Sequence, residues 1–264
     1  MKKIFLTGAS SGIGLAAAEN LVACGHEVWG TSRNPARLPS LGGFHPVAMD
    51  LSNLDSVREA FAVADREAKG VEVVINNAGS GHFDTARSLS PEKIEALFRT
   101  LVFAQMELCR LALAVLPERG GGLIINVTSL ASRLPVPLMS AYNAAKAAMA
   151  AYTFSLQVER RDRRVQVVDL QPADIRTNFN EVMARDSLGA DELKIWEVVD
   201  RNMREAPPPG LVAHRIVQLV ESDRPPPRIT VGGFFQAQIA PLIFRVLPQR
   251  VRVWGIRRYY GIRP

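Results

Sequence analysis

Short runs of aliphatic and β-branched residues alternate along the chain with longer segments in which apolar residues recur at helical spacing. The short runs are almost continuously hydrophobic, which is typical of parallel strands covered by helices on both faces of a sheet. The predicted strands are residues 3–7, 27–31, 45–49, 71–76, 123–128, 165–170 and 228–231. The predicted helices are residues 12–24, 54–69, 91–116, 140–161 and 211–222. This order predicts an α/β fold with a doubly wound parallel sheet.

The pattern needs only one hydrophobic core, and 264 residues are enough for one large α/β domain. We predict a single domain over residues 1–233. Within it, residues 178–204 lose the regular alternation and are expected to form a mobile insertion that covers the site. Residues 234–264 form a C-terminal tail that mixes apolar residues with arginines.

The net charge of +6 comes from this tail, because residues 235–264 carry six arginines and no acidic residue while the rest of the chain is balanced. A neutral body with a basic tail argues against a nucleic-acid-binding protein. It favours contact of the tail with a membrane surface, an acidic partner or an oligomer interface, or docking of the tail onto its own body. Pro241, Pro248 and Gly255 are expected to break it into short pieces.

The remaining composition restricts the compartment and the chemistry. The apolar run at the N-terminus is too short for a signal peptide and fits an opening strand. With only two cysteines a disulfide framework is not expected, so we predict a reducing, cytoplasmic setting. The four histidines have no ligand spacing, and no metal site is expected.

A glycine-rich turn connects the first predicted strand to an alanine-rich helix. Residues 7–14 read TGASSGIG, and the glycines allow a tight turn and a close approach of the backbone to a ligand. The N-terminus of the helix offers unpaired N–H groups to a pyrophosphate. The alternative is an ordinary strand-to-helix connection. The expected phosphate-binding residues are Gly8, Ser10, Ser11, Ile13 and Gly14.

The end of the second predicted strand indicates which dinucleotide binds. No acidic residue is present there to hold an adenosine ribose 2′-hydroxyl; Ser32 and Arg33 occupy the position instead. Because a guanidinium suits a 2′-phosphate, we predict NADP(H) as the cofactor in preference to NAD(H). The alternative for Arg33 is a solvated loop residue.

Tyr142 and Lys146 are four residues apart in a predicted helix and therefore share one face. A phenol with a pKa of about 10 is a poor base near neutral pH. An ammonium one turn away, together with a cationic nicotinamide, is expected to lower that pKa, so that Tyr142 acts as the acid/base. The alternative is a core tyrosine beside a surface lysine.

The glycine turn, Asn76-Asn77-Ala78-Gly79 and Tyr142-Asn143-Ala144-Ala145-Lys146 together resemble the short-chain dehydrogenase/reductase family. The resemblance covers residues 1–177 motif by motif. It implies a Rossmann-type sheet of seven strands, a bound nicotinamide cofactor, redox chemistry between carbonyl and alcohol, and a homo-oligomer.

The resemblance also assigns residues by position. Ser129 stands thirteen residues before Tyr142, as the family's catalytic serine does, and would orient the carbonyl oxygen; Thr128 and Ser132 are the competing hydroxyls. Tyr142 and Lys146 are expected to contact the cofactor as well. Further expected cofactor contacts are Asp50, Leu51, Asn77, Ala78, Gly79, Pro172, Ile175 and Thr177. For Asp50, a helix cap is the alternative.

Two positions depart from the family pattern. Ala173 replaces a glycine, which is tolerable where φ is negative. Leu101 replaces an asparagine that in the family supports a water near the active-site lysine, and a leucine side chain cannot hydrogen-bond. Plain helix packing is the other interpretation of Leu101, which leaves open a weakened enzyme, a compensated one or an inactive descendant.

We therefore predict an NADP(H)-dependent oxidoreductase that interconverts a hydrophobic ketone or aldehyde and its alcohol. The hydrophobic substrate is inferred from apolar residues of the insertion. These are Val182, Met183, Leu188, Leu193, Ile195 and Trp196. The alternatives are a dinucleotide-binding sensor without useful turnover, or an adaptor that works through its tail at a membrane or partner.

Overall fold

The computed structural model describes residues 1–185 and 188–262, and its centre is one seven-stranded sheet in which all neighbouring strands are parallel. The strand order is β3-β2-β1-β4-β6-β7-β9. The strands are β1 (Lys3–Leu6), β2 (Glu27–Ser32), β3 (Phe44–Ala48), β4 (Val73–Asn76), β6 (Gly122–Val127), β7 (Val165–Pro172) and β9 (Arg228–Val231). The predicted doubly wound Rossmann-type sheet is confirmed.

The predicted strand ends differ from the observed ones by one or two residues. β7 continues through Pro172, and β4 begins at Val73 rather than at residue 71. The Val71 amide donates to the Asp65 carboxylate (2.9 Å) and so belongs to the end of the preceding helix. The hydrophobic pattern does not reveal such a hydrogen bond to a side chain, and for this reason the predicted strand began too early.

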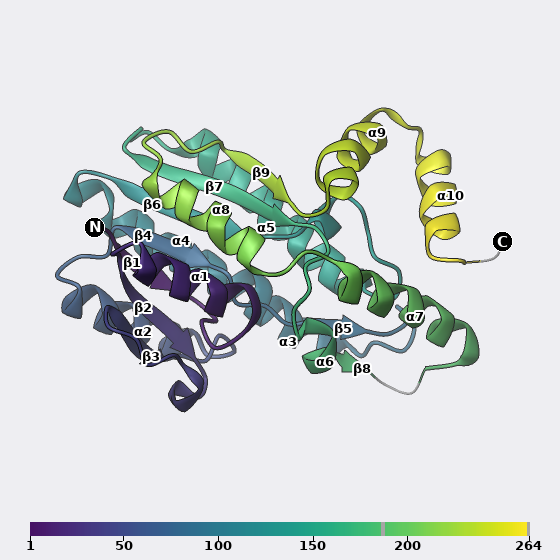
Figure 1. Cartoon of the computed structure of the whole chain (residues 1–264), viewed down its shortest axis with the longest axis horizontal. Helices are drawn as coiled ribbons and strands as arrows, with labels where there is room; N and C mark the ends of the chain where they lie inside the picture. The colour runs from purple at the N-terminus through teal and green to yellow at the C-terminus, as the bar shows by residue number, and fades with distance from the viewer. Residues whose placement is uncertain (186–187, 263–264) are drawn as a thin grey trace.

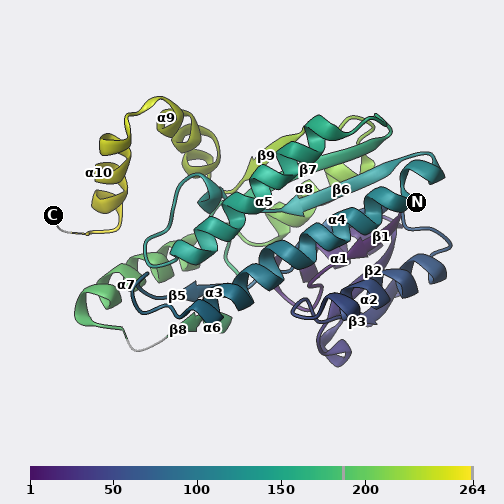
Figure 2. The ribbon, with the colours of Figure 1, turned by 180° about the vertical axis from the view of Figure 1, so that it is seen from behind.

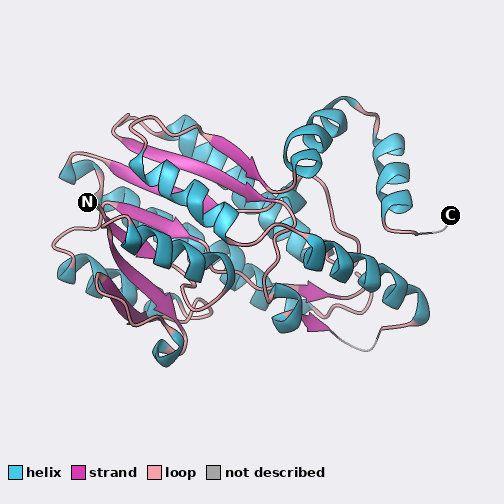
Figure 3. Ribbon diagram, viewed as in Figure 1, coloured by secondary structure: helices cyan, strands magenta, loops and turns pink. Residues whose placement is uncertain are grey.

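Helices cover both faces of the sheet, as the continuous hydrophobic strands require. One face carries α1 (Gly12–Ala23) and α8 (Gly210–Glu221), and the opposite face carries α2 (Leu54–Glu67), α4 (Ala104–Val115) and α5 (Ser140–Glu159) (Figures 1 and 2). The strands all point toward the end of the molecule where the later helices lie, and the N-terminus lies at the other end (Figure 3). The carboxyl ends of all seven strands therefore lie at one end of the sheet, which is where open parallel sheets bind their ligands.

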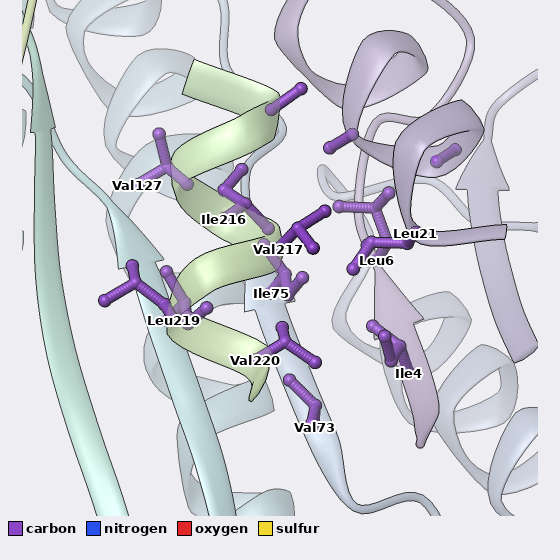
Figure 4. Close-up of a cluster of buried hydrophobic side chains, with 14 of the residues drawn as sticks. Ile4, Leu6, Leu21, Val73, Ile75, Val127, Ile216, Val217, Leu219 and Val220 are labelled. Atoms are coloured by element: carbon purple, nitrogen blue, oxygen red, sulfur yellow. The ribbon is translucent and has the colours of Figure 1, made fainter. Parts of the chain in front are cut away.

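The core between α8 and the sheet is built from aliphatic side chains. Val217 points from α8 toward Leu6 of β1, and Val220 points toward Val73 of β4 (Figure 4). All of these side chains are buried, and full burial of one such side chain contributes about 1.5–3 kcal/mol. The helix that precedes β9 thus holds the central strands in place.

The predicted helix over residues 91–116 is one continuous helical segment with a wide turn inside it. α3 (Pro91–Phe98) leads into a π-helical turn, η2 (Arg99–Phe103), and then into α4. Such a turn holds an extra residue and often marks a functional region. By length and composition the helical stretch over residues 91–119 could cross a membrane, but it supplies buried residues to two of the hydrophobic clusters.

Residues 178–204, expected to be a mobile insertion, contain regular structure: α6 (Phe179–Val182), the short strand β8 (Ala184–Arg185) and most of α7 (Ala190–Glu205). β8 pairs in parallel with β5 (His82–Phe83). Phe83 packs edge-on against Trp196 of α7. The mobility of this segment stays a prediction.

The tail forms a π-helical turn, η5 (Phe235–Ile239), followed by α9 (Ala240–Val246) and α10 (Gln249–Tyr259). The prediction that three residues break it is wrong for two of them. Pro241 lies in the first turn of α9, directly after η5, and the helical backbone runs through it; Gly255 lies inside α10. Of the three, Pro248 stands at a break, where α9 ends and α10 begins, so the tail folds as two helices that follow the end of β9 (Figure 1).

Candidate active site

A cleft of about 1080 Å³ opens at the carboxyl ends of the strands. The strand order reverses between β1 and β4, and ligands of such sheets bind at this switch point. Every residue predicted from the sequence to belong to the site lines this one cleft. They are Gly8, Ser10, Ser11, Ile13, Gly14, Ser32, Arg33, Asp50, Leu51, Asn77, Ala78, Gly79, Ser129, Tyr142, Lys146, Pro172, Ile175 and Thr177.

The glycine turn has the geometry that its sequence indicates. Gly8 has φ +72°, and a Cβ atom there would lie 2.9 Å from the Ala78 backbone. A Cβ atom on Gly14 would lie 2.0 Å from the Gly8 carbonyl oxygen. Ser11 at the N-cap of α1 makes no side-chain capping bond. The turn is therefore closed to side chains, and the N–H groups of the first helical turn face the cleft, which fits a pyrophosphate.

The loop after β4 is fixed directly to this turn. Thr7 Oγ1 accepts hydrogen bonds from the backbone amides of Asn77 (3.0 Å) and Ala78 (2.9 Å). The Asn77 side chain donates to the Thr7 carbonyl (3.0 Å). These bonds join the ends of β1 and β4, so the two motifs form one rigid floor at the switch point.

The loop after β2 brings two arginines to the cleft, of which the sequence analysis identified one. Arg33 follows the strand, and Arg37 ends the short 3₁₀ helix η1 (Pro35–Arg37), which Asn34 caps through its side chain. Both arginines are exposed at the rim. The sequence Asn34-Pro35 directly after Arg33 is typical of a helix start. This signal could have predicted a short helical turn that brings Arg37 to the cleft together with Arg33.

Asp50 combines the two roles proposed for it, because it lines the cleft and also caps a turn. Its carboxylate accepts from the Ser52 amide (2.9 Å) and the Ser52 hydroxyl (2.8 Å). These hydrogen bonds lower the pKa of Asp50, and the charge of Arg33 lowers it further. The cap of α2 itself is Asn53.

Tyr142, Lys146 and Ser129 meet at the centre of the cleft. Tyr142 and Lys146 lie on successive turns of α5, and the Lys146 Nζ atom is 5.9 Å from the centre of the Tyr142 ring. The Lys146 ammonium donates to the Val127 carbonyl at the end of β6 (2.9 Å). Ser129 follows two residues later and hydrogen-bonds the Tyr142 phenol. The helix thus presents both side chains to the strand end that carries Ser129.

The pKa of Tyr142 moves in the direction opposite to the one expected from the ammonium alone. Burial raises it to about 12; the hydrogen bond from Ser129 opposes this rise and the charge of Asp174 adds to it. Burial also lowers the pKa of Lys146 to about 8, against the charge of Asp169. At neutral pH the phenol is protonated and ready to donate a proton, and the lysine is still mainly charged.

The structure separates the three candidate hydroxyls. Thr128 is buried and donates to the Asp169 carboxylate, and the Ser132 hydroxyl donates to the Ser129 carbonyl (2.7 Å). Of these three hydroxyls, that of Ser129 is the one that hydrogen-bonds the Tyr142 phenol. The preference for Ser129, which the sequence supported by spacing, agrees with this geometry.

Leu101 lies within the wide turn η2 and is completely buried. It packs with apolar neighbours of α3 and α5, and a Cβ atom on Gly79 would lie 3.4 Å from its side chain. The packing interpretation of Leu101 therefore holds. The neighbouring Thr100 lines the cleft and donates to the Ala96 and Leu97 carbonyls (3.2 and 3.1 Å).

Ala173 at the end of β7 replaces a family glycine without strain, because its φ is not positive. The segment that faces Ala173, directly after β9, carries a glycine, Gly232. A Cβ atom on Gly232 would lie 2.5 Å from the Ala173 Cβ atom. The Ala173 amide donates to the Val231 carbonyl (2.8 Å), so the extra methyl fits where the two segments touch.

The apolar wall of the cleft differs from the one predicted. Six apolar residues of the insertion were the basis for a hydrophobic substrate; of the five whose side chains the structure describes, Met183 lines the cleft and the other four do not. Leu188, Ile195 and Trp196 pack in a hydrophobic cluster around Phe83, and Leu193 is exposed. The Val182 side chain lies outside the described residues. The observed apolar lining includes Leu134, Val136, Met139, Phe179, Val199, Met203, Phe244 and Ile256.

Several of these lining residues belong to the tail, for which docking onto its own body was one of the alternatives expected from the sequence. Gln236, Tyr259 and Tyr260 also line the cleft, and the Asn202 side chain of α7 donates to the Tyr259 hydroxyl (3.1 Å). The tail therefore builds one wall of the cleft. In the part of the chain that the structure describes, no group of three or more His, Cys, Asp or Glu side chains has a metal-binding arrangement.

The sequence is similar to those of proteins that are named as reductases or oxidoreductases. The chain is 29% identical over 267 residues to the 3-ketodihydrosphingosine reductase of Bacteroides thetaiotaomicron, with 98% of each chain covered. It is 34% identical over 188 residues to the uncharacterized oxidoreductase YbbO of Escherichia coli, with 68% of each chain covered.

Solved structures share the whole fold. A short-chain dehydrogenase from Streptomyces avermitilis aligns with a TM-score of 0.80 and 24% identity, covering 99% of this chain and 96% of that chain. One from Burkholderia phymatum in complex with NAD aligns with a TM-score of 0.81 and 21% identity, covering 96% and 95%. The family model of the short chain dehydrogenases matches residues 2–187. The chain belongs to the short-chain dehydrogenase family.

Proposed function

We propose that this protein is an NADP(H)-dependent reductase that converts a hydrophobic ketone or aldehyde to its alcohol and can catalyse the reverse reaction. The observation that carries the proposal is the meeting of Tyr142, Lys146 and Ser129 with the glycine turn in one cleft. A bound nicotinamide supplies the hydride for the carbonyl carbon. The protein must then supply a proton for the carbonyl oxygen and hold the substrate in line.

The three side chains divide this work. Tyr142 donates the proton, and the high pKa that burial gives its phenol keeps that proton in place at neutral pH. The Ser129 hydroxyl beside it orients the carbonyl oxygen and stabilises the charge that develops there. Lys146, charged below about pH 8, assists return of the proton to Tyr142 and holds the nicotinamide ribose. The amides of Ser11 and Ile13 would hold the pyrophosphate.

The preference for NADP(H) is supported by the rim of the cleft. Arg33 and Arg37 both line it beside Ser32, where a 2′-phosphate would lie, and β2 ends without an acidic residue. A hydrophobic substrate is supported by the lining from Met139, Met183 and the tail. The relative from Bacteroides thetaiotaomicron, named a 3-ketodihydrosphingosine reductase, aligns with 98% of this chain.

The experiment compares wild type with Tyr142→Phe. NADPH and NADH consumption is followed by absorbance with a panel of apolar ketones and aldehydes. We expect the wild type to consume NADPH with one class of carbonyl and the variant to lose about 100-fold or more in kcat, because general acid catalysis contributes about that much. The variant should still bind NADPH.

If both proteins bind NADPH and neither turns over any carbonyl, the reductase proposal fails. The dinucleotide-binding sensor would then be the better description, and Leu101 the reason for it.

We further propose that the protein works in the cytoplasm as a homo-oligomer whose tail contacts an anionic membrane surface. Leu242, Val246 and Trp254 are 66%, 79% and 65% exposed on α9 and α10, among arginines and without any acidic residue. Exposed apolar side chains with basic neighbours are typical of interfacial helices. The neutral body gives no reason to expect nucleic acid as a partner.

The membrane contact is tested with Val246→Glu and Trp254→Glu in the full chain. We expect the wild type to bind vesicles of anionic lipid better than vesicles of zwitterionic lipid, and each variant to lose that binding. If the variants change the oligomeric state in sedimentation and leave vesicle binding unchanged, the exposed face is an interface between copies and the membrane proposal is wrong.

A further inference from the structure

A carboxylate lines the cleft close to the Tyr142 phenol. Asp174 follows β7 by two residues and shares the lining with Tyr142, Tyr259 and Tyr260. Burial raises the pKa of each of these three phenols, and the negative charge of Asp174 raises it further. The carboxylate therefore lies within electrostatic range of the three phenol groups. None of the proposed steps of the reduction uses it.

The tail holds this carboxylate in position. The Gln236 amide donates to Asp174 Oδ2 (2.7 Å) and also lies 3.4 Å from the Tyr259 hydroxyl. Burial raises the pKa of Asp174, and this hydrogen bond only partly opposes the rise. Among the residues that the structure describes, no cationic side chain forms an ion pair with Asp174.

The surroundings of Asp174 match one kind of ligand. A half-buried carboxylate without a cation is less stable in its charged form, and a cationic ligand that enters the site removes that cost. Aromatic rings attract ammonium groups through their faces. A carboxylate that shares a cleft with three tyrosines and with apolar residues such as Met183, Val199 and Phe244 is therefore suited to an ammonium group on an otherwise hydrophobic molecule.

We propose that Asp174 binds the ammonium group of the substrate, so that the site selects amino ketones over ketones without an amine. This proposal rests on the proposed function, because Tyr142 and Ser129 must hold the carbonyl oxygen. The apolar remainder of the substrate lies along Met183, Val199 and Phe244. The name of the Bacteroides relative denotes a molecule of this class, a long-chain ketone that carries an amine.

The first test uses the wild-type protein and two substrates. The NADPH-dependent reduction of a long-chain 2-amino ketone is compared with that of the same ketone without the amine. We expect kcat/KM to be about 10- to 100-fold higher for the amino ketone, since a hydrogen bond between charged groups is worth about that factor in a partly buried site. Equal kcat/KM values would overturn the role of Asp174 and leave the reductase proposal intact.

The second test uses Asp174→Asn, which keeps the shape of the side chain and an oxygen that can accept from Gln236. We expect the preference for the amino ketone to disappear, while kcat/KM for the ketone without the amine stays within about 3-fold of wild type. A preference that persists, or an equal loss for both substrates, would show that Asp174 only supports the tail. Asp191→Asn is the matched control, because Asp191 is exposed on α7 and paired with Lys194.

A binding measurement keeps the two proposals distinguishable. Titration of the NADPH-loaded protein with the long-chain amino alcohol and with its N-acetyl derivative measures recognition of the charge without turnover. We expect the free amine to bind about 10-fold or more tightly in wild type and equally in Asp174→Asn. If neither ketone is reduced but this difference is present, the reductase proposal fails and the assignment of Asp174 stands; equal binding in wild type overturns it.

Discussion

Replacing Lys146 by methionine should stabilise the fold while damaging the site. The Lys146 side chain is only 4% exposed, and burial lowers its pKa from 10.5 to about 8. A lowering of this size corresponds to about 3 kcal/mol of unfavourable burial of the ammonium at neutral pH. Methionine removes the charge and occupies a similar volume. It also removes the hydrogen bond to the Val127 carbonyl (2.9 Å), which costs about 1 kcal/mol.

The net expectation is a gain of about 2 kcal/mol in the free energy of unfolding at pH 7, or about 4 °C in Tm. Between pH 8 and 10.5 the unfolded wild type binds one proton more than the folded protein, so wild-type stability rises with pH relative to the variant. The advantage of Lys146→Met should therefore be present in full below pH 8 and be lost by about pH 10.5.

The assay is urea unfolding followed by tryptophan fluorescence at several pH values, without NADPH, because a ligand would stabilise only the protein that binds it. Lys194→Met is the control, since Lys194 is exposed on α7 and should change stability by less than about 0.5 kcal/mol. A variant that is less stable than wild type at pH 7, or a difference that does not change with pH, would refute the reasoning.

Three further outcomes are expected. Arg33→Ala and Arg37→Ala should each lower kcat/KM for NADPH by about 10-fold and leave that for NADH nearly unchanged, because each removes a charged bond to a 2′-phosphate; equal losses with both cofactors would contradict this. Leu101→Asn should lower the free energy of unfolding by about 1–3 kcal/mol in urea unfolding, since its amide would be buried among apolar side chains; an unchanged midpoint would contradict the packing role. The kcat of wild type should fall above about pH 8 as Lys146 loses its proton, while Tyr142 stays protonated, and a kcat that is flat from pH 7 to 10 would exclude a need for the charged lysine.

The sequence by itself determined that the chain forms a sheet of parallel strands, and it determined the residues at the centre of the site. Strand and helix periodicity, the glycine turn and the Tyr142-to-Lys146 spacing are local, since they depend only on backbone geometry over a few residues. Rossmann-type sheets bring the carboxyl ends of their strands to one edge, so motifs that follow different strands were bound to meet there. For this reason all predicted site residues line one cleft.

Only the tertiary structure decided what surrounds that centre. The tail became a wall of the cleft through contacts between Gln236 and Asp174 and between Tyr259 and Asn202, all far apart in the sequence. The direction of the Tyr142 pKa was set by burial, which raises it despite the opposing hydrogen bond of Ser129. Burial, electrostatics and the choice of substrate wall depend on which distant segments pack together, and no local pattern of residues encodes that packing.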